Sequence, residues 1–303
     1  MGGLVDIRVR STIPPEEMEE KVGKVLTADD VNVLLTNDCR VRKPDGSLLA
    51  VYRKGAIPFE MREEMRPRLR QFRSSGTDNR GQASGSERVP GGQTRTRSAK
   101  VPSSIIGAFE AQGFRKFCRL TAWTGRETEE FKDLWPLFEF LGERFAKDVP
   151  ERHEAQMDEV RRTHPDWVIP RTPFTTITIN NTWPTGVHKD KGDLDKGFSV
   201  LATLRKGEYE GGVLTFPEYR VGVDMRDGDV LLMDAHEWHG NTRFVPEVPR
   251  NVNGMPIWDE LSFERISLVA YFRTKLVQCD DLPSEEEKRR VLAEQRNLSF
   301  IGE

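Results

Sequence analysis

The chain has 303 residues, of which 36% are hydrophobic and 31% charged, and its formal net charge is −3. This composition can bury a sizeable core, as one elaborated domain or two small ones. No apolar run approaches the roughly 20 residues that span a bilayer, and the first residues lack the basic and apolar segments of a signal peptide. We therefore expect a soluble cytoplasmic protein with no membrane segment and no evident obligate protein partner.

The first hundred residues are predicted to form a mixed region followed by a basic loop. Residues 40–52 read as a hairpin that turns at Pro44-Asp45-Gly46, and residues 60–72 as a short charged helix. Residues 73–100 contain scarcely any large apolar residue, so we expect a mobile loop. Residues 40–100 hold 15 Lys and Arg against 6 Asp and Glu. Such a cluster suits phosphate contacts, although a solvated face explains the charge alone equally well.

Two helices are predicted next. Residues 128–147 carry apolar side chains three or four positions apart, which is typical of one packed amphipathic helix. A second helix is expected from Pro150 to about Arg162, with proline in its first turn.

From Phe174 the apolar period changes from helical to alternating, which predicts strands. The candidate strands are 175–180, 198–204, 212–216, 219–223, 229–233 and 265–274, with an insertion over 241–264. Short strands after a group of helices favour an α+β jelly-roll barrel. We expect three regions: 1–72, a basic loop over 73–102, and a domain over 103–303 with its β core at about 174–276.

Cysteine usage indicates a reducing environment. Cys39, Cys118 and Cys279 are widely spaced and form no Cys-x-x-Cys pattern. We therefore expect reduced, mostly buried thiols rather than a disulfide framework.

The pair His188 and Asp190, followed by His239, has the residue types of a non-haem iron(II) site. Residues two apart at a strand end point to the same side, and His239 follows the strand predicted over 229–233. His236 is the competing ligand. We favour His239, because it would enter the next strand while His236 lies in the turn.

Arg265 and Ser267 also share one face, within an apolar strand. A buried guanidinium can bind a carboxylate through two hydrogen bonds, so this pair suits a dicarboxylate such as 2-oxoglutarate. The alternative is that Arg265 forms a structural ion pair with Glu264 or Glu260.

The stretch Thr175–Asp193 resembles the core of the TET/JBP family of DNA-modifying dioxygenases, in particular its compact phage-type members. Similar motifs are Gly197–Leu201, Tyr209–Pro217, Gly228–Leu232 and His239-Gly-Asn. The resemblance covers about residues 103–276.

The resemblance implies a double-stranded β-helix flanked by helices, which hydroxylates the 5-methyl group of 5-methylcytosine or thymine in DNA with Fe(II), 2-oxoglutarate and O2. It makes His188, Asp190 and His239 the iron ligands and Arg265, helped by Ser267, the 2-oxoglutarate anchor. The long gap after His239 leaves Arg243 as a lesser candidate.

A methyl group in a duplex cannot reach the metal, so the nucleotide must flip out. The resemblance makes Asp193 a contact for the flipped base, together with Asn180 or Asn181. Trp183, Phe198 or Tyr209 would replace the lost stacking, or are plain core residues. A DNA-modifying enzyme of this kind is expected in a bacterial or phage-infected cell.

Overall fold

The computed structural model describes residues 4–73, 81–85, 87–88, 94–95, 101–113 and 115–301. The chain divides into two compact units: unit 1 comprises Met1–Ser104, Thr178–Lys191 and Ser199–Val269, and unit 2 comprises Ile105–Ile177, Gly192–Phe198 and Ala270–Glu303. Most of the loop predicted over 73–100 lies outside the described residues. No helix in the described ranges is long and apolar enough to cross a membrane.

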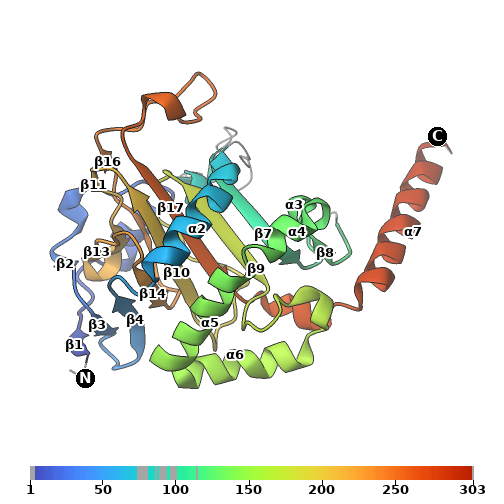
Figure 1. Ribbon diagram of the computed structural model, residues 1–303, viewed down its shortest axis with the longest axis horizontal. Helices are drawn as coiled ribbons and strands as arrows, with labels where there is room; N and C mark the ends of the chain where they lie inside the picture. Colours follow the sequence, from blue (N-terminus) through green and yellow to red (C-terminus); the bar gives the residue numbers. More distant parts are fainter. Residues whose placement is uncertain are drawn as a thin grey trace. The chain divides into compact units, whose positions relative to one another are not determined.

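Unit 1 is built mainly of strands (Figure 1). Its strands are β1 Val5–Arg8, β2 Val33–Leu35, β3 Cys39–Arg42, β4 Leu48–Arg53, β5 Glu87–Arg88, β6 Thr94–Arg95, β10 Ser199–Lys206, β11 Glu210–Gly211, β12 Leu214–Phe216, β13 Val221–Val223, β14 Val230–Met233, β15 Gly240–Asn241 and β16 Phe244–Val245. Its helices are α1 Pro15–Lys21 and α2 Phe59–Arg70, with 3-10 turns η1 Ala28–Asp30, η2 Gln71–Arg73, η3 Gly81–Ser84, η5 Pro217–Tyr219 and η6 Trp258–Glu260. Strands β7 Ser103–Phe109, β9 Thr176–Asn181 and β17 Glu264–Tyr271 each contain residues of both units.

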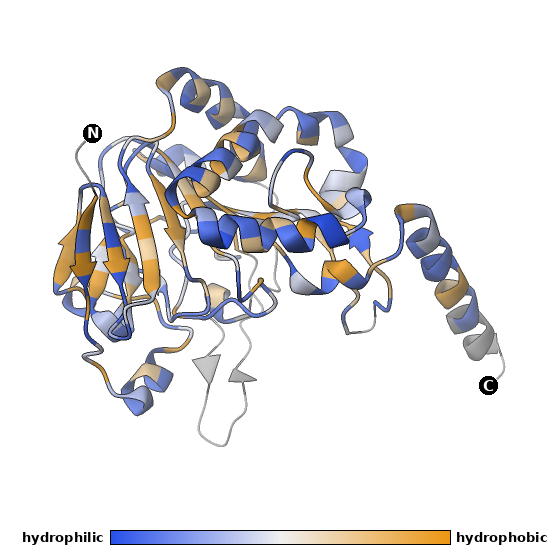
Figure 2. Ribbon diagram, turned by 90° about the horizontal axis from the view of Figure 1, so that it is seen from below, coloured by the Kyte–Doolittle hydropathy of each residue, from blue (hydrophilic) through white to orange (hydrophobic). Residues whose placement is uncertain are grey.

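Two sheets of unit 1 enclose one hydrophobic core. The larger is part of a nine-stranded sheet whose first seven strands have the order β1-β3-β4-β14-β10-β17-β9, and the smaller has the order β15-β12-β13-β2. One cluster of buried residues includes Tyr52 and Leu231 from the larger sheet and Phe216 and Val223 from the smaller. Side chains from both sheets therefore meet face to face, as in a jelly roll. Figure 2 shows the apolar character of these strands.

The outer face of the larger sheet is covered by α2, which lies across β10 and β17 in Figure 1. The buried guanidinium of Arg66 in α2 donates to the backbone oxygen of Arg205 at 3.0 Å. The prediction of a helix over 60–72 is thus confirmed. The predicted hairpin is also confirmed: β3 and β4 pair antiparallel, and the turn contains Gly46 at φ +87°.

Residues 1–72 contribute more to the β core than their mixed pattern indicated. The pairs β1–β3 and β2–β13 are parallel, and β4 pairs with β14. The structure accordingly groups these residues with the strands of unit 1, in contrast to the boundary expected at residue 103. Parallel pairing between segments far apart in sequence leaves no turn signal by which it could be predicted.

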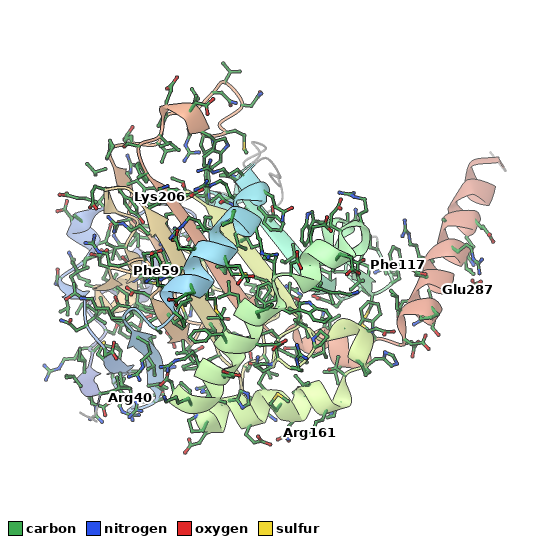
Figure 3. All side chains as sticks on the ribbon, viewed as in Figure 1. Arg40, Phe59, Phe117, Arg161, Lys206 and Glu287 are labelled. Atoms are coloured by element: carbon green, nitrogen blue, oxygen red, sulfur yellow. A yellow bond between two sulfur atoms is a disulfide. The ribbon has the colours of Figure 1, made fainter. Side chains whose placement is uncertain are left out.

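Unit 2 is largely helical. Its strands β7 and β8 Arg119–Leu120 pair antiparallel, and its helices are α3 Ala122–Arg126, α4 Thr128–Lys132, α5 Trp135–Asp148, α6 Pro150–Arg162 and α7 Leu282–Ile301, with turns η4 Pro165–Trp167 and η7 Thr274–Gln278. Helix α6 has the predicted bounds. Its outer face is charged, as Arg161 illustrates in Figure 3, and Arg161 pairs there with Glu154 and Asp158.

The single helix predicted over 128–147 is wrong, because the segment forms two helices. Helix α4 ends at Lys132 and α5 begins at Trp135, with Pro136 in its first turn. Proline lacks the N–H that a continuous helix needs, so it favours a new helix start. The apolar period persists across the break, which is why periodicity alone missed it.

The prediction that all three cysteines are reduced is also wrong. Cys118 and Cys279 form a disulfide within unit 2, and only Cys39 is a free thiol among the described residues. The two partners are 161 residues apart, so their spacing carried no sign of the bond. Chain folding alone brings them together.

Candidate active site

Two backbone hydrogen bonds set the two imidazoles of unit 1 side by side. His188 follows β9, and His239 immediately precedes β15. The N–H of His188 donates to the oxygen of His239 at 2.9 Å, and the N–H of His239 donates back at 3.0 Å. The ring centroids are consequently 4.3 Å apart. This is an antiparallel bridge between segments about fifty residues apart.

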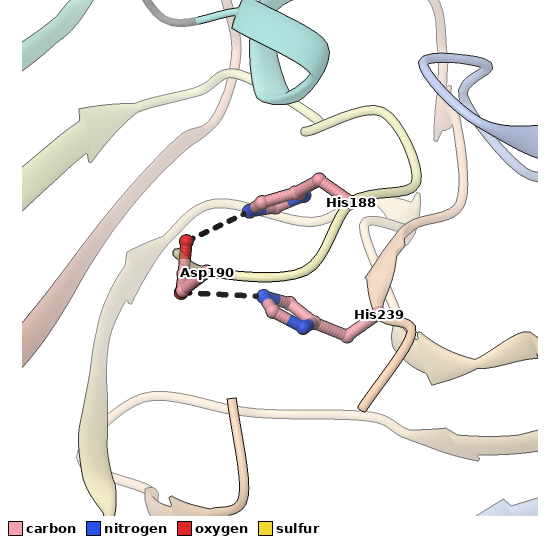
Figure 4. A group of neighbouring side chains, drawn as sticks. All are labelled: His188, Asp190 and His239. Carbon is pink, nitrogen blue, oxygen red and sulfur yellow. Dashed lines mark ion pairs between the residues drawn. The ribbon is translucent and has the colours of Figure 1, made fainter. Parts of the chain in front are cut away.

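Each imidazole is oriented by a backbone carbonyl. Nδ1 of His188 lies 2.7 Å from the oxygen of Gly186, and Nδ1 of His239 lies 2.9 Å from that of Glu237. A carbonyl can only accept, so each Nδ1 carries the hydrogen and each Nε2 keeps its lone pair. Both Nε2 atoms face the carboxylate of Asp190, at 3.5 and 3.6 Å (Figure 4).

This arrangement is that of a metal site with three protein ligands. One ligand atom from each of His188, Asp190 and His239 can be chosen so that all lie within 4.8 Å of one another. Burial, reinforced by the neighbouring His188, lowers the pKa of His239 to about 4, so its imidazole is neutral near pH 7. Neutral imidazoles and one carboxylate suit Fe(II) and leave further positions open.

His236 does not join this group. Its Nδ1 lies 3.3 Å from Oδ1 of Asp234, in the turn before His239. The geometry therefore favours His239 over His236 as the third ligand. His239 is the histidine whose backbone pairs with that of His188, and this pairing is what distinguishes it from His236.

Lys43 supports the turn that carries His239, a role that no local sequence pattern predicts. Its Nζ lies 3.1 Å from Asp234 and 2.9 Å from Glu237. Burial would raise the pKa of Asp234, yet hydrogen bonds from His236 and the charge of Lys43 lower it to about 2. Lys43 follows β3, and the pairing of β4 with β14 brings this hairpin beside the turn that contains Asp234.

Arg265 is buried in β17 with an unsatisfied guanidinium. Its side chain is 3% exposed, and Nη2 has no hydrogen-bond partner among the described residues. Burial, the largest influence, lowers the pKa of Arg265. A buried charge without a full set of partners is costly, so this guanidinium fits an anionic ligand.

The alternative ion pair with Glu264 is excluded by the strand geometry. Glu264 binds Arg70 of α2 at 2.7 Å and also pairs with Arg73. Consecutive residues of a strand point to opposite faces, so Arg265 faces away from α2. Arg243, the lesser candidate for the anchor, is exposed. Ser267 is buried and shares the face of Arg265.

The strand register separates the two asparagines that were left as alternatives. The N–H of Thr182 donates to the oxygen of Arg265 at 2.7 Å, and the N–H of Arg265 donates to Oγ1 of Thr182 at 3.1 Å. Two positions back, Asn180 lies on the face of Arg265 and Ser267, and Asn181 points the other way. Both asparagines have buried side-chain atoms without a partner in the described structure.

Asp193 belongs to unit 2, where its backbone forms a bridge with that of Arg273. Oγ1 of Thr274 donates to its backbone oxygen at 3.1 Å. Arg273 in turn holds the buried carboxylate of Glu110. The carboxyl group of Asp193 is largely buried, and its predicted contact with a base remains a prediction.

The aromatic residues named for base stacking already have neighbours. The guanidinium of Arg250 lies 4.6 Å over the ring of Trp183, and that of Arg152 lies 4.7 Å over Phe198. Tyr209 packs against Phe263 at 4.6 Å between ring centroids.

A basic cavity of about 640 Å³ opens beside the segment that leads to His188. It is lined in part by Gly186, Trp183, Lys24, Arg243 and Arg250, with Glu247 as an acidic residue. The side chains of Lys24 and Arg243 are both exposed. The cavity therefore offers cationic groups that suit phosphate.

Comparison with known proteins identifies one family. Residues 106–274 match Tet_JBP, described as the oxygenase domain of the 2OGFeDO superfamily. Thymine dioxygenase JBP1 of Trypanosoma brucei brucei is 35% identical over 193 residues, which are 63% of this chain and 21% of that protein. The Leishmania braziliensis protein of the same name is 33% identical over 203 residues, 65% of this chain and 23% of that protein. The chain thus spans about a fifth of the length of these relatives.

A solved structure described as NgTET1 in complex with 5mC DNA shares the fold. Its TM-score is 0.58 at 13% identity, and the match covers 92% of this chain and 99% of that one. The similarity extends over nearly the whole chain and supports the predicted α+β fold with a jelly-roll core.

Proposed function

This chain belongs to the Tet_JBP family of 2-oxoglutarate- and iron-dependent oxygenases, and from that membership we propose that it hydroxylates the 5-methyl group of a pyrimidine in DNA. The cofactor set of the superfamily is Fe(II), 2-oxoglutarate and O2. The relatives named thymine dioxygenases make thymine the first base to test, with 5-methylcytosine as the second.

One observation carries the proposal: a His-Asp-His group with both Nε2 atoms turned toward the Asp190 carboxylate occurs in the same unit as a buried, incompletely paired arginine. The first suits Fe(II), and the second suits the distal carboxylate of 2-oxoglutarate. His188, Asp190 and His239 would hold the metal. Arg265, with Ser267 on its face, would bind the oxo acid.

Iron held by His188, Asp190 and His239 would supply the activation of O2 that a methyl C–H bond requires. The residues of the chain bind the metal and the oxo acid, orient the imidazoles and exclude water. The carbonyls of Gly186 and Glu237 keep the imidazoles in the tautomer that presents Nε2. Burial of Arg265 keeps water from the carboxylate that it neutralises, which strengthens their attraction.

The substrate nucleotide must leave the duplex to reach this site, at a cost of about a few kcal/mol of stacking. We assign Asp193, and Asn180 or Asn181, to contacts with the flipped base. Asn180 is the one of the pair that shares the face of Arg265, so it would line the same part of the site. Its position there also suits a contact with the oxo acid.

Lys24 and Arg243 would bind phosphates next to the flipped nucleotide, at the mouth of the basic cavity. Such contacts position the DNA without reading its sequence. We propose the cytoplasm of a bacterial or phage-infected cell as the place where the protein acts. The Cys118–Cys279 disulfide is unusual for that compartment, so its redox state in cells should be measured as well.

The test is nucleoside mass spectrometry. The protein would be incubated with Fe(II), ascorbate and 2-oxoglutarate and two DNAs, one containing 5-methylcytosine and one with thymine as its only methylated base. The expected result is 5-hydroxymethyluracil or 5-hydroxymethylcytosine, absent with the Asp190→Ala variant. Succinate formation without a modified base would instead favour a protein side chain or a free small molecule as the substrate.

A further inference from the structure

A second buried polar atom without a partner belongs to Tyr209, whose ring packs against the residue two positions before Arg265. The hydroxyl of Tyr209 is buried and has no hydrogen-bond partner in the described structure, as is true of Nη2 of Arg265. The ring of Tyr209 packs against Phe263, two residues before Arg265. Phe263 and Arg265 thus project toward the same side of the chain.

Electrostatics agree with this proximity. After burial, which raises the pKa of Tyr209, Arg265 is the group with the largest effect on that pKa. After burial, Tyr209 is likewise the group with the largest effect on the pKa of Arg265. This mutual influence on the pKa accords with the packing of Tyr209 against Phe263, two residues before Arg265.

Tyr209 is held rigidly by its surroundings. The buried guanidinium of Arg205 lies 3.7 Å over its ring and donates to its backbone oxygen at 2.5 Å. Phe244 covers the ring at 5.3 Å between centroids, in an edge-to-face contact. The phenol is therefore fixed in place before any ligand binds, which lowers the entropic cost of a contact.

The buried region around Tyr209 and Arg265 carries an excess of positive charge. Arg205 and Arg265 are both buried, and Asp224 is the carboxylate that acts on Arg265. Asp224 already pairs with Arg205 at 4.0 Å and with Arg226. One further carboxylate would balance the two buried guanidinium groups and satisfy both unpartnered atoms.

We propose that the Tyr209 hydroxyl, positioned by Arg205, donates a hydrogen bond to the distal carboxylate of a bound 2-oxo diacid and thereby selects diacids over monoacids. This inference rests on the proposed function, because it takes Arg265 as the main contact of that carboxylate. Tyr209 is then a binding residue for the cosubstrate, whereas Arg205 acts through Tyr209 as a positioning residue.

The experiment compares two oxo acids of equal chain length. The full chain would be loaded with Mn(II), which permits binding without turnover, and titrated calorimetrically with 2-oxoglutarate and with 2-oxopentanoate. Tyr209→Phe should weaken 2-oxoglutarate binding by about 10-fold or more, because a hydrogen bond to a charged group is lost. The same variant should bind 2-oxopentanoate within about twofold of the unsubstituted protein, since that acid has no distal carboxylate.

Two further measurements test whether Tyr209→Phe changes ligand affinity only by disturbing the packing of the protein. Removal of an unpartnered buried hydroxyl should leave the melting temperature of the ligand-free protein unchanged or higher. Tyr219→Phe is the matched control, because its hydroxyl already donates to Glu237 at 3.1 Å, and it should leave the ratio of the two affinities unchanged.

Equal losses for both acids, or no loss for either, would overturn the role of Tyr209 and leave the proposed function intact. If the unsubstituted protein binds no 2-oxoglutarate, the proposed function and this inference fail together. A lowered melting temperature of ligand-free Tyr209→Phe would assign the hydroxyl to the structure instead.

Discussion

Replacement of Arg265 by methionine should move protein stability and ligand affinity in opposite directions. Methionine has a similar length and no charge, so Arg265→Met removes the guanidinium while roughly filling its space. In the ligand-free protein the guanidinium is 3% exposed and incompletely paired. Its loss should leave the free energy of unfolding unchanged or raise it by about 1–3 kcal/mol. For a chain of this length that is an increase of about 2–4 °C in melting temperature per kcal/mol.

The same change should damage binding of 2-oxoglutarate. A distal carboxylate would then be buried without its cation, which costs about 3–5 kcal/mol, or roughly two to almost four orders of magnitude in affinity. Thermal melting with increasing 2-oxoglutarate, in the presence of Mn(II), measures both effects in one series. Arg243→Met is the control, because that arginine is exposed and should leave both quantities near their original values.

The reasoning would be refuted by a destabilised ligand-free Arg265→Met protein that still responds to 2-oxoglutarate. That result would make Arg265 a structural residue, balanced by Asp224 alone. Loss of the response in Arg243→Met would move the carboxylate anchor to Arg243.

Three other results are expected. His239→Ala should abolish stoichiometric binding of Mn(II), measured by electron paramagnetic resonance, whereas His236→Ala should bind normally; the reverse result would make His236 the ligand in place of His239. Combined Lys24→Gln and Arg243→Gln should weaken DNA binding, measured by fluorescence anisotropy at several salt concentrations. The slope of log affinity against log salt concentration should fall by about 2 in magnitude, because two phosphate contacts are lost. An unchanged slope would show that the DNA binds another surface. Cys118→Ser should lower the free energy of unfolding in urea by about 2–5 kcal/mol, because the disulfide closes a loop of 161 residues; equal midpoints for the variant and the original protein would show that the bond is not formed.

The chemistry of the site was predictable from the sequence because it depends on local spacing. His188 and Asp190 are two residues apart, as are Arg265 and Ser267, and alternation along extended backbone places each pair on one side. The strands were predicted for the same reason, from alternating β-branched residues and turn-forming glycines. These patterns extend over only a few residues, so they can be recognised without knowledge of the fold.

The tertiary structure alone decided which residues meet. His239 rather than His236 lies beside His188 because of one backbone bridge, and Glu264 is engaged by α2, which frees Arg265 for a ligand. The Cys118–Cys279 bond, the support of Lys43 and the pairing of β2 with β13 likewise join segments far apart in the chain. Such contacts depend on the packing of whole sheets, whose many side-chain interactions are individually weak and leave no pattern in the intervening sequence.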